Sequence, residues 1–443
     1  MEIKDILRYT VSVKKEILGL QINTDTKQQL LEEISERAIK GQKTFIVTPY
    51  SEFFYYAAKD YRFHNIINNA DFALPDGIAL QWLGEYYSKP LTFKNYYLKI
   101  VQAFFQEISS GFAVFFSRNK RNKIISERIS GADFFWDIIG EADKQNQKVF
   151  LLGGFGNTAE LAAKKVLSKY PNLQIEYSNA NPNENSGIIA IETFKPDYLM
   201  VAYGPIKQEY WISEHLKSLQ ATVAIGIGGT LDYVSGTKKR APKFIRALGL
   251  EWLHRLITQP YRFKRIWHAT ASLALGAVRD KVFKTLGYRR NSAGVIINQK
   301  KQVLVLSRCR ERSQPGKDAH WQFPQGGIEE GETPQQGLLR EMKEELGTNN
   351  FTVLGTCSKT FSYNWQHFFR PLFWNTHRFQ GQIQYIFYLL FTGSDDQFIL
   401  DNHEIDSFRW IQTEVLHAFI HPMRHAMLNV ALTELSENLA KIK

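Results

Sequence analysis

Short apolar runs alternate with helix-like segments between residues 44 and 229. Four of these runs read TFIVTP (44–49), KVFLLGG (148–154), DYLMVAYG (197–204) and ATVAIGIGG (221–229). Runs of this kind, with helical periodicity between them, are typical of parallel strands that helices cover on both faces. The pattern therefore predicts an α/β domain built on a Rossmann-like parallel sheet.

The pattern changes at about Gly287. From there the chain carries the strand-like runs SAGVIINQ, QVLVLSR, QYIFYLLFTG and FRWIQT, with a single strong helical pattern at 334–346. These runs predict a second α/β domain with a mixed sheet and about 150 residues. We expect a first domain at 1–270, a linker at 271–286 and a second domain at 287–443.

Composition narrows the class of protein. The 443 residues are 44% hydrophobic and 22% charged, which is ordinary for folded domains and excludes disordered and fibrous chains. No stretch reaches the roughly 18 uninterrupted apolar residues of a membrane-spanning helix, and the N-terminal residues lack the pattern of a secretory signal. Cys309 and Cys357 are too few for a disulfide framework or a cysteine zinc site, which predicts a reducing cytoplasm.

The net charge of +11 is concentrated in one segment. Residues 236–290 hold fourteen Lys and Arg residues against two acids, Glu251 and Asp280, interleaved with apolar and aromatic residues at helical spacing. Such a segment fits a nucleic-acid patch, a surface for anionic lipid, or a cluster that binds phosphates in an active site. A solvated basic face over an apolar core stripe is the simpler alternative.

Aromatic residues are concentrated in a second segment, 86–116. Ten of them lie there, where the average of the chain would place about four. Core packing is one interpretation. A surface that contacts lipid or a partner is the other, because Lys94 and Lys99 lie among these residues and Arg118 and Lys120 follow them.

The clearest chemical motif is WQFPQGGIEEGETPQQGLLREMKEELG, at residues 321–347. Thr333 is in position to cap a helix with Gln336 as its capping-box partner, and Pro334 occupies the first helical position. Gly347 follows the last turn, where a left-handed residue ends many helices. The motif therefore predicts a helix with both ends specified.

Three glutamates of this helix share one face, which we expect to be exposed. Glu341, Glu344 and Glu345 are spaced i, i+3 and i+4. Without a cation such a face repels itself, and clustered carboxylates are the hard oxygen ligands that Mg²⁺ and Mn²⁺ prefer beside substrate phosphates. A metal there would neutralise a diphosphate and activate a water for attack at phosphorus.

The motif matches every fixed position of the Nudix box, and residues 287–443 resemble a Nudix hydrolase domain, an α/β/α sandwich. The flanks GYRRNSAGVII (287–297) and WQFPQGGI (321–328) are similar to the branch that contains RNA pyrophosphohydrolases and diadenosine-polyphosphate hydrolases. The resemblance implies that Glu344 and Glu345 are catalytic and that Arg289 binds substrate phosphate. The implied ligands of Mg²⁺ or Mn²⁺ are Glu341, Glu344, Glu345 and Glu404. The implied structural residues are Gly326, Glu332, Arg340 and Gly347, with Arg340 paired to Glu332.

A glycine-rich turn follows the predicted strand at 148–154. Gly154, Gly156 and Ala159 have the spacing of a dinucleotide-binding turn, and Glu176 lies twenty residues beyond Gly156. A dinucleotide-dependent oxidoreductase is therefore one hypothesis, although the turn falls in the middle of the domain. More generally, amides at the start of the following helix could bind a phosphate.

Longer motifs of the first domain point to a different class. They read NADFALPDGIAL (69–80), RISGAD (128–133), KPDYLMVAYGPIKQEYWI (195–212), GIGGTLDYVSGTKKRAP (226–242) and GLEWLHRLITQPYRFKR (249–265). Together they resemble the WecG/TagA/CpsF family of glycosyltransferases over about residues 1–270. Members of this family transfer N-acetylmannosamine and related sugars from a UDP donor to a polyprenyl-diphosphate-linked sugar, without an essential metal.

The resemblance implies that Asp76 is the base that takes the proton of the acceptor hydroxyl. It implies that a set of polar and glycine residues binds substrate: Thr48, Arg128, Gly154, Gly156, Gln208, Glu209, Asp232, Arg240, Arg255, Arg262 and Arg265. The last three match arginines that the family is proposed to place over its active site at the membrane. This chain departs from the family pattern at Tyr50, where the family has Asn, and in the length of the aromatic segment 86–116.

We therefore expect a bifunctional protein at the inner face of the cytoplasmic membrane. One half would be an inverting UDP-sugar glycosyltransferase of cell-surface polysaccharide synthesis, with a polyprenyl-diphosphate-linked acceptor and an anionic membrane surface as partners. The other half would be a Nudix hydrolase acting on a nucleoside polyphosphate or an RNA 5′ end. The alternative is an enzyme that processes RNA ends or dinucleoside polyphosphates, with a first domain that only binds nucleotide sugar or membrane. A homo-oligomer is compatible with either.

Overall fold

The computed structural model describes residues 12–116, 124–247, 251–258, 260, 263–308, 321–365, 369, 372, 379–401, 404–420 and 424–439. The chain divides into two compact units. The first comprises Met1–Val282 and Gln366–Phe373, and the second comprises Phe283–Trp365 and Trp374–Lys443.

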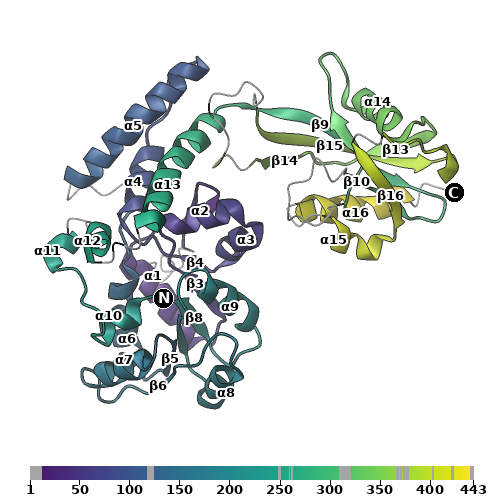
Figure 1. Ribbon diagram of the computed structural model, residues 1–443. Coiled ribbons are helices and arrows are strands. Elements are labelled where there is room, and N and C mark those ends of the chain that lie inside the picture. The colour runs from purple at the N-terminus through teal and green to yellow at the C-terminus, as the bar shows by residue number, and fades with distance from the viewer. Residues whose placement is uncertain are drawn as a thin grey trace, which may run out of the picture. The chain divides into compact units, whose positions relative to one another are not determined.

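The first unit is built on a six-stranded sheet in which every described pairing is parallel, in the order β4-β3-β8-β7-β5-β6 (Figure 1). Its strands are β3 (Thr44–Val47), β4 (Phe72–Ala73), β5 (Val149–Gly153), β6 (Ile175–Ser178), β7 (Tyr198–Ala202) and β8 (Val223–Gly226). The four apolar runs form β3, β5, β7 and β8, which confirms the predicted α/β fold. The pattern missed β4 and β6, which lie at the two edges of the sheet; β4 is only two residues long and β6 is half exposed.

Helices cover both faces of this sheet because adjacent strand residues point to opposite sides. Ile46, Leu151 and Met200 face one apolar cluster, which is completed by α1 (Lys27–Ile39), α6 (Gly131–Lys144), α7 (Thr158–Leu167) and α10 (Thr230–Val234). Val47 and Leu152 face the other cluster, which is completed by α2 (Ser51–Lys59), α3 (Tyr61–Asn69), α4 (Ile78–Tyr87), α8 (Asn185–Phe194) and α9 (Lys207–His215).

A hairpin precedes the sheet. β1 (Lys14–Ile17) and β2 (Leu20–Asn23) pair antiparallel across Leu18 and Gly19, which have φ values of 50° and 82°. Two consecutive residues with positive φ are typical of the tight turns that join hairpin strands. Our sequence analysis did not predict this hairpin, because Leu-Gly is a weak turn signal.

The segment that we expected to be a linker, 271–286, is largely helical. It belongs to α13 (Phe263–Phe283), which follows α11 (Lys243–Ala247) and α12 (Glu251–Thr258). Leu273 and Ala277, one helical turn apart, are buried in the core of the first unit at 1% and 0% exposure. The apolar spacing of this segment therefore serves packing, and the helix runs to the end of the first unit.

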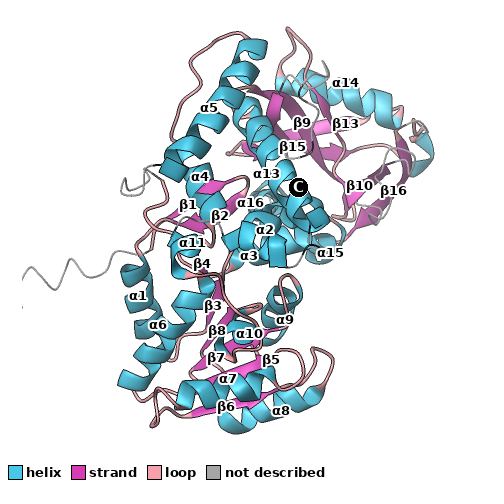
Figure 2. Cartoon of the chain, turned by 60° about the vertical axis from the view of Figure 1, so that its left-hand side comes forward, coloured by secondary structure: helices cyan, strands magenta, loops and turns pink. Residues whose placement is uncertain are grey.

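The second unit is a mixed sheet between helices (Figure 2). Its strands are β9 (Gly287–Ile297), β10 (Val303–Arg308), β11 (Trp321–Gln322), β12 (Gln325–Gly327), β13 (Phe351–Thr356), β14 (Phe361–Asn364), β15 (Phe379–Phe391) and β16 (Ile405–Ile411). The long strands β9 and β15 are parallel, and the other described pairings are antiparallel.

Helix α14 (Pro334–Leu346) packs on one face of this sheet and α16 (His425–Leu439) on the other. Leu338 and Met342 of α14 join the cluster that contains Ile296, whereas Leu428 of α16 joins the cluster that contains Val295. Short helical segments η4 (Asp395–Gln397), η5 (Thr413–Val415) and α15 (Leu416–Phe419) complete the unit. The predicted α/β/α sandwich is confirmed. Among the described residues, no helix is long and apolar enough to cross a membrane.

Candidate active sites

The predicted site residues of the first unit follow the carboxyl ends of its strands. Thr48 follows β3, Asp76 follows β4, Gly154 follows β5, Gln208 follows β7, and Asp232 follows β8. Parallel strands bring these ends to one edge of the sheet. From this edge β5 connects to β6 on one side, whereas β7 connects to β8 on the other. Diverging connections of this kind open a crevice at which open α/β sheets bind ligands.

Asp76 lies in a turn that contacts the end of β3 and the start of α6. Its backbone N–H donates to the Pro49 carbonyl at 3.0 Å, which fixes the turn beside the end of β3. A Cβ built on Gly131 would lie 3.6 Å from Asp76 Oδ2 and 3.8 Å from Thr48 Cγ2. The carboxylate is half-buried. Asp76, Thr48 and the start of α6 therefore form one small cluster.

Thr48 and Tyr50 have distinct environments. The Thr48 hydroxyl is nearly buried and donates to the Gly226 carbonyl at 3.3 Å, so it ties β3 to the end of β8. Tyr50 begins α2; its hydroxyl donates to Glu52 Oε2 at 2.7 Å and its ring contacts Phe53 at 5.3 Å between centroids. Tyr50 thus packs along α2 rather than presenting an amide to the site.

The guanidinium of Arg240 binds the carboxylate of Asp133 through two hydrogen bonds, at 2.6 and 2.9 Å. Burial lowers the pKa of Arg240, but Asp133, Glu251 and Asp76 together hold it above its usual value. Arg240 is therefore near enough to Asp76 to interact with its charge. The nearby Arg128 donates to a main-chain carbonyl, that of Arg246, at 3.2 Å.

Gln208 and Glu209 are buried, at 2% and 0% exposure. Gln208 Nε2 donates to Glu209 Oε1 at 2.8 Å, and Gln208 Oε1 accepts from the Gly228 N–H at 2.9 Å. Glu209 Oε2 accepts from the N–H of Ile206, a residue held at φ 75°. Burial raises the pKa of Glu209 to about 7, against the lowering effect of these hydrogen bonds. The pair holds the loop after β7 against β8.

The glycine turn lies at the end of β5, beside the crevice. Gly153, Gly154 and Gly156 have φ values of 89°, 92° and 58°, which only glycine adopts readily. A Cβ on Gly153 would lie 2.7 Å from the ring of Tyr203. In the following helix the Ala159 N–H donates to Asn179 Oδ1 at 3.2 Å, so a side chain already caps α7.

The remaining predicted residues of the first unit are placed as follows. Asp232 pairs with Lys238 and its carbonyl accepts from the Thr237 hydroxyl, so it organises the loop after α10. Arg255 lies in α12 and Arg265 in α13, but their side chains are outside the described part of the chain, as is the whole of Arg262. Their predicted role over the active site stays a prediction.

In the second unit, Gly326 makes room for a carboxylate. A Cβ at this position would lie 1.7 Å from Glu341 Cδ, so the Glu341 side chain occupies the space that any other residue would fill. Thr333 and Gln336 form the predicted capping box at the start of α14, and Gly347 ends the helix at φ 72°. The motif therefore places Glu341 of α14 against the main chain of β12.

Arg340 joins the loop to the helix, as predicted. Its Nε and Nη2 donate to the Glu332 carboxylate at 2.8 and 3.2 Å, and Nη2 also donates to the Gly327 carbonyl at 2.7 Å. Nη1 donates to Glu341 at 3.1 Å and to Glu344 at 3.0 Å. One arginine thus holds three carboxylates close together.

The acidic residues of α14 are not uniformly exposed, which corrects our expectation. The side chain of Glu344 is 58% exposed, whereas Glu345 is only 5% exposed. Helix α14 lies against the sheet, so the rotation that exposes Glu344 turns Glu345 inward. Burial raises the pKa of Glu341; Arg340 lowers it, and the charges of Glu344 and Glu404 raise it again. Glu404, from the loop before β16, therefore lies within electrostatic reach of Glu341.

These carboxylates fit a hard cation by their chemistry. All donors are oxygens, and the charges of Glu344 and Glu404 both raise the pKa of Glu341, so these carboxylates lie near one another. The described residues contain no group of three His, Cys, Asp or Glu side chains already arranged around one point. Mg²⁺ commonly binds one or two carboxylates and completes its shell with water and substrate phosphates, and the donor set here matches that mode.

Two further features border this site. Arg289 is exposed, and a Cβ on Gly327 would lie 2.5 Å from its Nη2, so the guanidinium lies on the main chain of β12. Beside it, buried amide side chains contact one another across four strands, which our sequence analysis did not predict. They are Asn291, Gln322, Gln325 and Gln384. The only sequence signal for this amide cluster is the presence of polar residues at inward positions of apolar strands.

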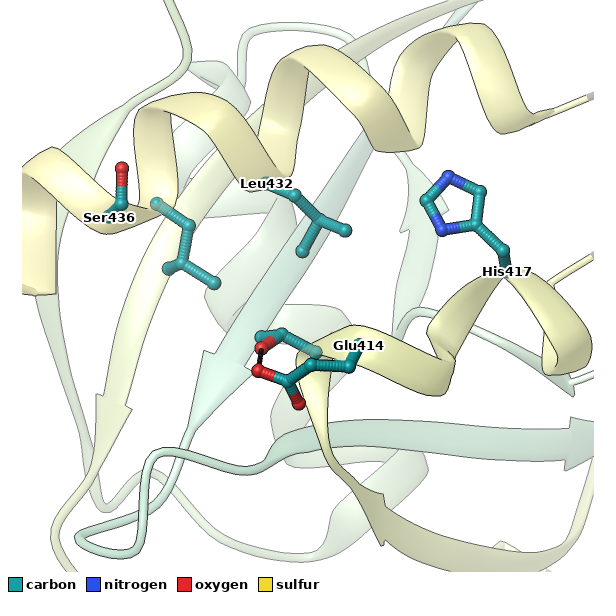
Figure 3. Close-up of a pocket in the computed structure, with 6 residues that line it drawn as sticks. Glu414, His417, Leu432 and Ser436 are labelled. Carbon is teal, nitrogen blue, oxygen red and sulfur yellow. Dashed lines mark hydrogen bonds between the residues drawn. The ribbon is translucent and has the colours of Figure 1, made fainter.

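A shallow pocket of about 350 Å³ lies elsewhere in the second unit, between η5, α15 and α16 (Figure 3). His417 and Glu414 line it with the apolar side chains of α16, and His417 Nε2 lies 2.6 Å from Asn429 Oδ1. Helix α16 covers the face of the sheet opposite to α14. The pocket therefore contains none of the predicted site residues.

Comparison with known proteins divides the chain close to the boundary between the two units. The glycosyl transferase WecG/TagA/CpsF family model matches residues 15–117 and 111–286, and the NUDIX domain model matches residues 287–430. An N-acetylglucosaminyldiphosphoundecaprenol N-acetyl-β-D-mannosaminyltransferase of Staphylococcus aureus is 28% identical over 260 residues, which covers 58% of this chain and 89% of the relative.

Several solved structures are similar to about a third of this chain. A dihydroneopterin triphosphate pyrophosphohydrolase of E. coli is 24% identical, with a TM-score of 0.25, and covers 31% of this chain and 90% of its own. An Ap4A hydrolase of C. elegans is 19% identical, with a TM-score of 0.26, and covers 34% of this chain and 98% of its own. On its family match, the chain belongs to the WecG/TagA/CpsF family of glycosyl transferases and carries a NUDIX domain at its C-terminal side.

Proposed function

We propose that the first unit transfers an N-acetylhexosamine of the N-acetylmannosamine type from a UDP-sugar to a polyprenyl-diphosphate-linked acceptor. The observation that carries this proposal is the cluster of Asp76, Thr48 and Gly131 at the carboxyl edge of the sheet. The Staphylococcus aureus relative, whose name states such a transfer, supports the same chemistry.

The chemical step is a displacement at the anomeric carbon of the donor. The acceptor hydroxyl oxygen forms the new bond to this carbon from the face opposite to UDP, Asp76 takes the hydroxyl proton, and the bond to the diphosphate oxygen breaks. The electron pair leaves with UDP, so the configuration inverts. Asp76 raises the nucleophilicity of the hydroxyl, and the basic residues around Arg240 oppose the charge that develops on the diphosphate.

The donor has a path along the carboxyl edge. Asp76 follows the edge strand β4, and the glycine turn follows β5, four strand spacings away or about 19 Å. A nucleotide placed in the crevice between β5 and β7 would extend its sugar toward Asp76. The buried Gln208–Glu209 pair shapes the wall of this path by holding the loop after β7.

Product analysis tests this assignment. The full chain is incubated with a panel of UDP-sugars and a polyprenyl-diphosphate N-acetylglucosamine acceptor, and the lipid products are identified by mass spectrometry. We expect one N-acetylhexosamine to be added, with release of one UDP for each sugar transferred. Release of UDP without a glycosylated lipid would contradict the proposal.

The second unit, in the same proposal, hydrolyses a nucleoside diphosphate-linked substrate, such as a nucleoside polyphosphate or an RNA 5′ end. Glu341, Glu344, Glu345 and Glu404 would hold Mg²⁺ or Mn²⁺, which neutralises phosphate charge and activates water when it is bound. Arg340 keeps the acidic residues converged through its bonds to Glu332, Glu341 and Glu344. Arg289, exposed near the start of β9, would bind a substrate phosphate.

The acceptor also suggests where the protein works. A polyprenyl diphosphate is anchored in a bilayer, so its hydroxyl is presented at the membrane surface. We therefore place the first unit at the inner face of the cytoplasmic membrane, with its basic segment 236–290 toward anionic lipid. Salt-sensitive RNA binding in place of vesicle binding would favour the RNA-processing alternative.

A further inference from the structure

Helix α5 (Tyr96–Phe116) has one buried and one exposed apolar face. Its buried face packs on α4 and on α13, through Ile100 and Ala103 against Val278 and Val282. Its exposed face carries a row of large apolar side chains that are 48–70% exposed. We call this row the α5 stripe: Tyr97, Leu98, Val101, Phe105, Ile108 and Phe112.

The α5 stripe is continuous. Leu98, Val101, Phe105, Ile108 and Phe112 follow one another at alternating steps of three and four residues, which keeps them on one side of a helix. Isolated exposed apolar residues are common on protein surfaces, but a contiguous row of this kind marks an interaction surface.

The charges around the α5 stripe are of one sign. Glu107 is the only acidic residue of α5; it is 8% exposed, and burial raises its pKa to about 8 while Lys281 lowers it. Lys94, which is exposed, precedes the stripe, whereas Lys99 is half-buried and follows Leu98 on another side of the helix. An apolar helical face with a cation at its start and no exposed acid on its helix complements the boundary of an anionic bilayer. A second copy of the same face would offer no opposite charge.

The helix is firmly attached to the body of the unit. Lys281 of α13 donates to the Tyr86 carbonyl at 2.5 Å and to Gln106 Oε1 at 2.7 Å, and Trp82 Nε1 donates to the Glu107 carbonyl at 3.1 Å. Figures 1 and 2 both show α5 running beside α13 and α4. These contacts therefore fix the position of the α5 stripe on the first unit.

We propose that α5 lies in the interface of an anionic membrane, with the α5 stripe buried between lipid headgroups and acyl chains and Lys94 beside lipid phosphates. The inference deepens the proposed function, because an acceptor anchored in lipid requires the enzyme to dock on its surface. It assigns that docking to the aromatic segment 86–116, which contains α5.

Vesicle flotation of the full chain tests the proposal. Vesicles of phosphatidylcholine alone are compared with vesicles that contain phosphatidylglycerol, for the parent and for the double variant Phe105→Gln/Phe112→Gln. The matched control is Ile39→Gln/Ile189→Gln, which removes two apolar side chains of similar exposure, 60% and 64%, from α1 and α8. Lys94→Gln tests the electrostatic part.

We expect the stripe variant to bind anionic vesicles at least tenfold more weakly than the parent and the control. Lys94→Gln should weaken binding about fivefold, the factor that corresponds to about 1 kcal/mol for one basic residue at an anionic surface. Unchanged binding of the stripe variant would overturn the proposal. So would a parent that is dimeric without lipid and becomes monomeric in the stripe variant, since the occupant would then be a second copy.

The membrane-binding proposal and the glycosyltransferase proposal can fail independently of each other. A water-soluble acceptor with a short lipid does not require docking, so the stripe variant should transfer sugar to it at the parental rate. If the parent transfers no sugar to either acceptor, the glycosyltransferase assignment fails, whatever the vesicles show. If transfer proceeds and the stripe variant still binds vesicles, only the α5 assignment fails.

Discussion

At the scale of single residues, both sites depend on glycines whose missing Cβ leaves room for functional side chains. Gly326 gives its space to Glu341, and a Cβ at Gly226 would lie 2.5 Å from Gln208 Nε2 and 2.8 Å from Glu209 Oε1. Gly131 opens the space before Asp76 and Thr48 in the same way, with looser contacts. The polar groups can therefore lie directly against main chain.

Asp76→Asn should abolish sugar transfer while UDP-sugar binding changes by less than about threefold. The amide keeps the shape of the side chain but cannot take the acceptor proton, and loss of a general base costs on the order of 10² to 10⁴ in rate. Transfer rates and donor affinity measured on the same preparation check this. Transfer within a few-fold of the parent would make Asp76 an ordinary turn residue.

Gly326→Ala should lower nucleotide hydrolysis by more than about tenfold and destabilise the second unit by about 1–3 kcal/mol, the usual cost of overpacking. The added methyl would overlap Glu341 Cδ, at 1.7 Å, so the carboxylate or the loop must move. Gly287→Ala is the matched control, because nothing lies within 4 Å of a Cβ there. Equal effects of the two substitutions on hydrolysis would contradict the role of Gly326.

Glu209 predicts a pH dependence of stability. Burial raises its pKa from 4.5 to about 7, so the folded state binds this proton more tightly than the unfolded state. Its contribution favours folding at low pH and is lost as pH rises from about 4.5 to 7, by up to about 3 kcal/mol. Glu209→Gln should remove this loss, as judged by the unfolding midpoint of the first unit at pH 5 and pH 8. If the unfolding midpoints of parent and variant change equally between pH 5 and pH 8, the pKa of Glu209 is not raised in the folded state.

At the scale of elements, the sequence predicted those strands and helices whose own residues carry a clear apolar or capping pattern. Strands β3, β5, β7 and β8 are buried on both faces and read as continuous apolar runs, and α14 carries a cap at each end. Short or half-exposed strands such as β4 and β6 lack that signal because the sheet places them at its edges. The end of α13 lies in the segment expected to be a linker; its packing against the core, through Leu273 and Ala277, depends on residues distant in the sequence.

The sequence also predicted only part of each candidate site. Spacing alone placed Glu341, Glu344 and Arg340 together, since a helix and its preceding loop bring them to one place. It could not show that Glu345 turns inward, because that depends on how α14 rotates against the sheet. Nor could it show that Arg240 is paired with Asp133, a contact between residues 107 positions apart in the chain.

At the scale of the whole molecule, the two units have separate cores and separate chemistry. The apolar clusters of the first unit are built from its own sheet and helices, and those of the second unit from β9 to α16. In the proposed function, the first site uses cationic side chains and one carboxylate, whereas the second uses clustered carboxylates that would hold a cation. We therefore propose that one chain holds two active sites with independent requirements.

The direct test measures sugar transfer and nucleotide hydrolysis in the same sample of full-length protein, with Mg²⁺ and with EDTA. Glu344→Gln is run alongside, because it removes one exposed carboxylate of α14 without opening a cavity. We expect EDTA and Glu344→Gln each to stop hydrolysis while transfer continues at the parental rate. Loss of transfer together with hydrolysis in EDTA, or hydrolysis that continues without a divalent cation, would contradict this expectation.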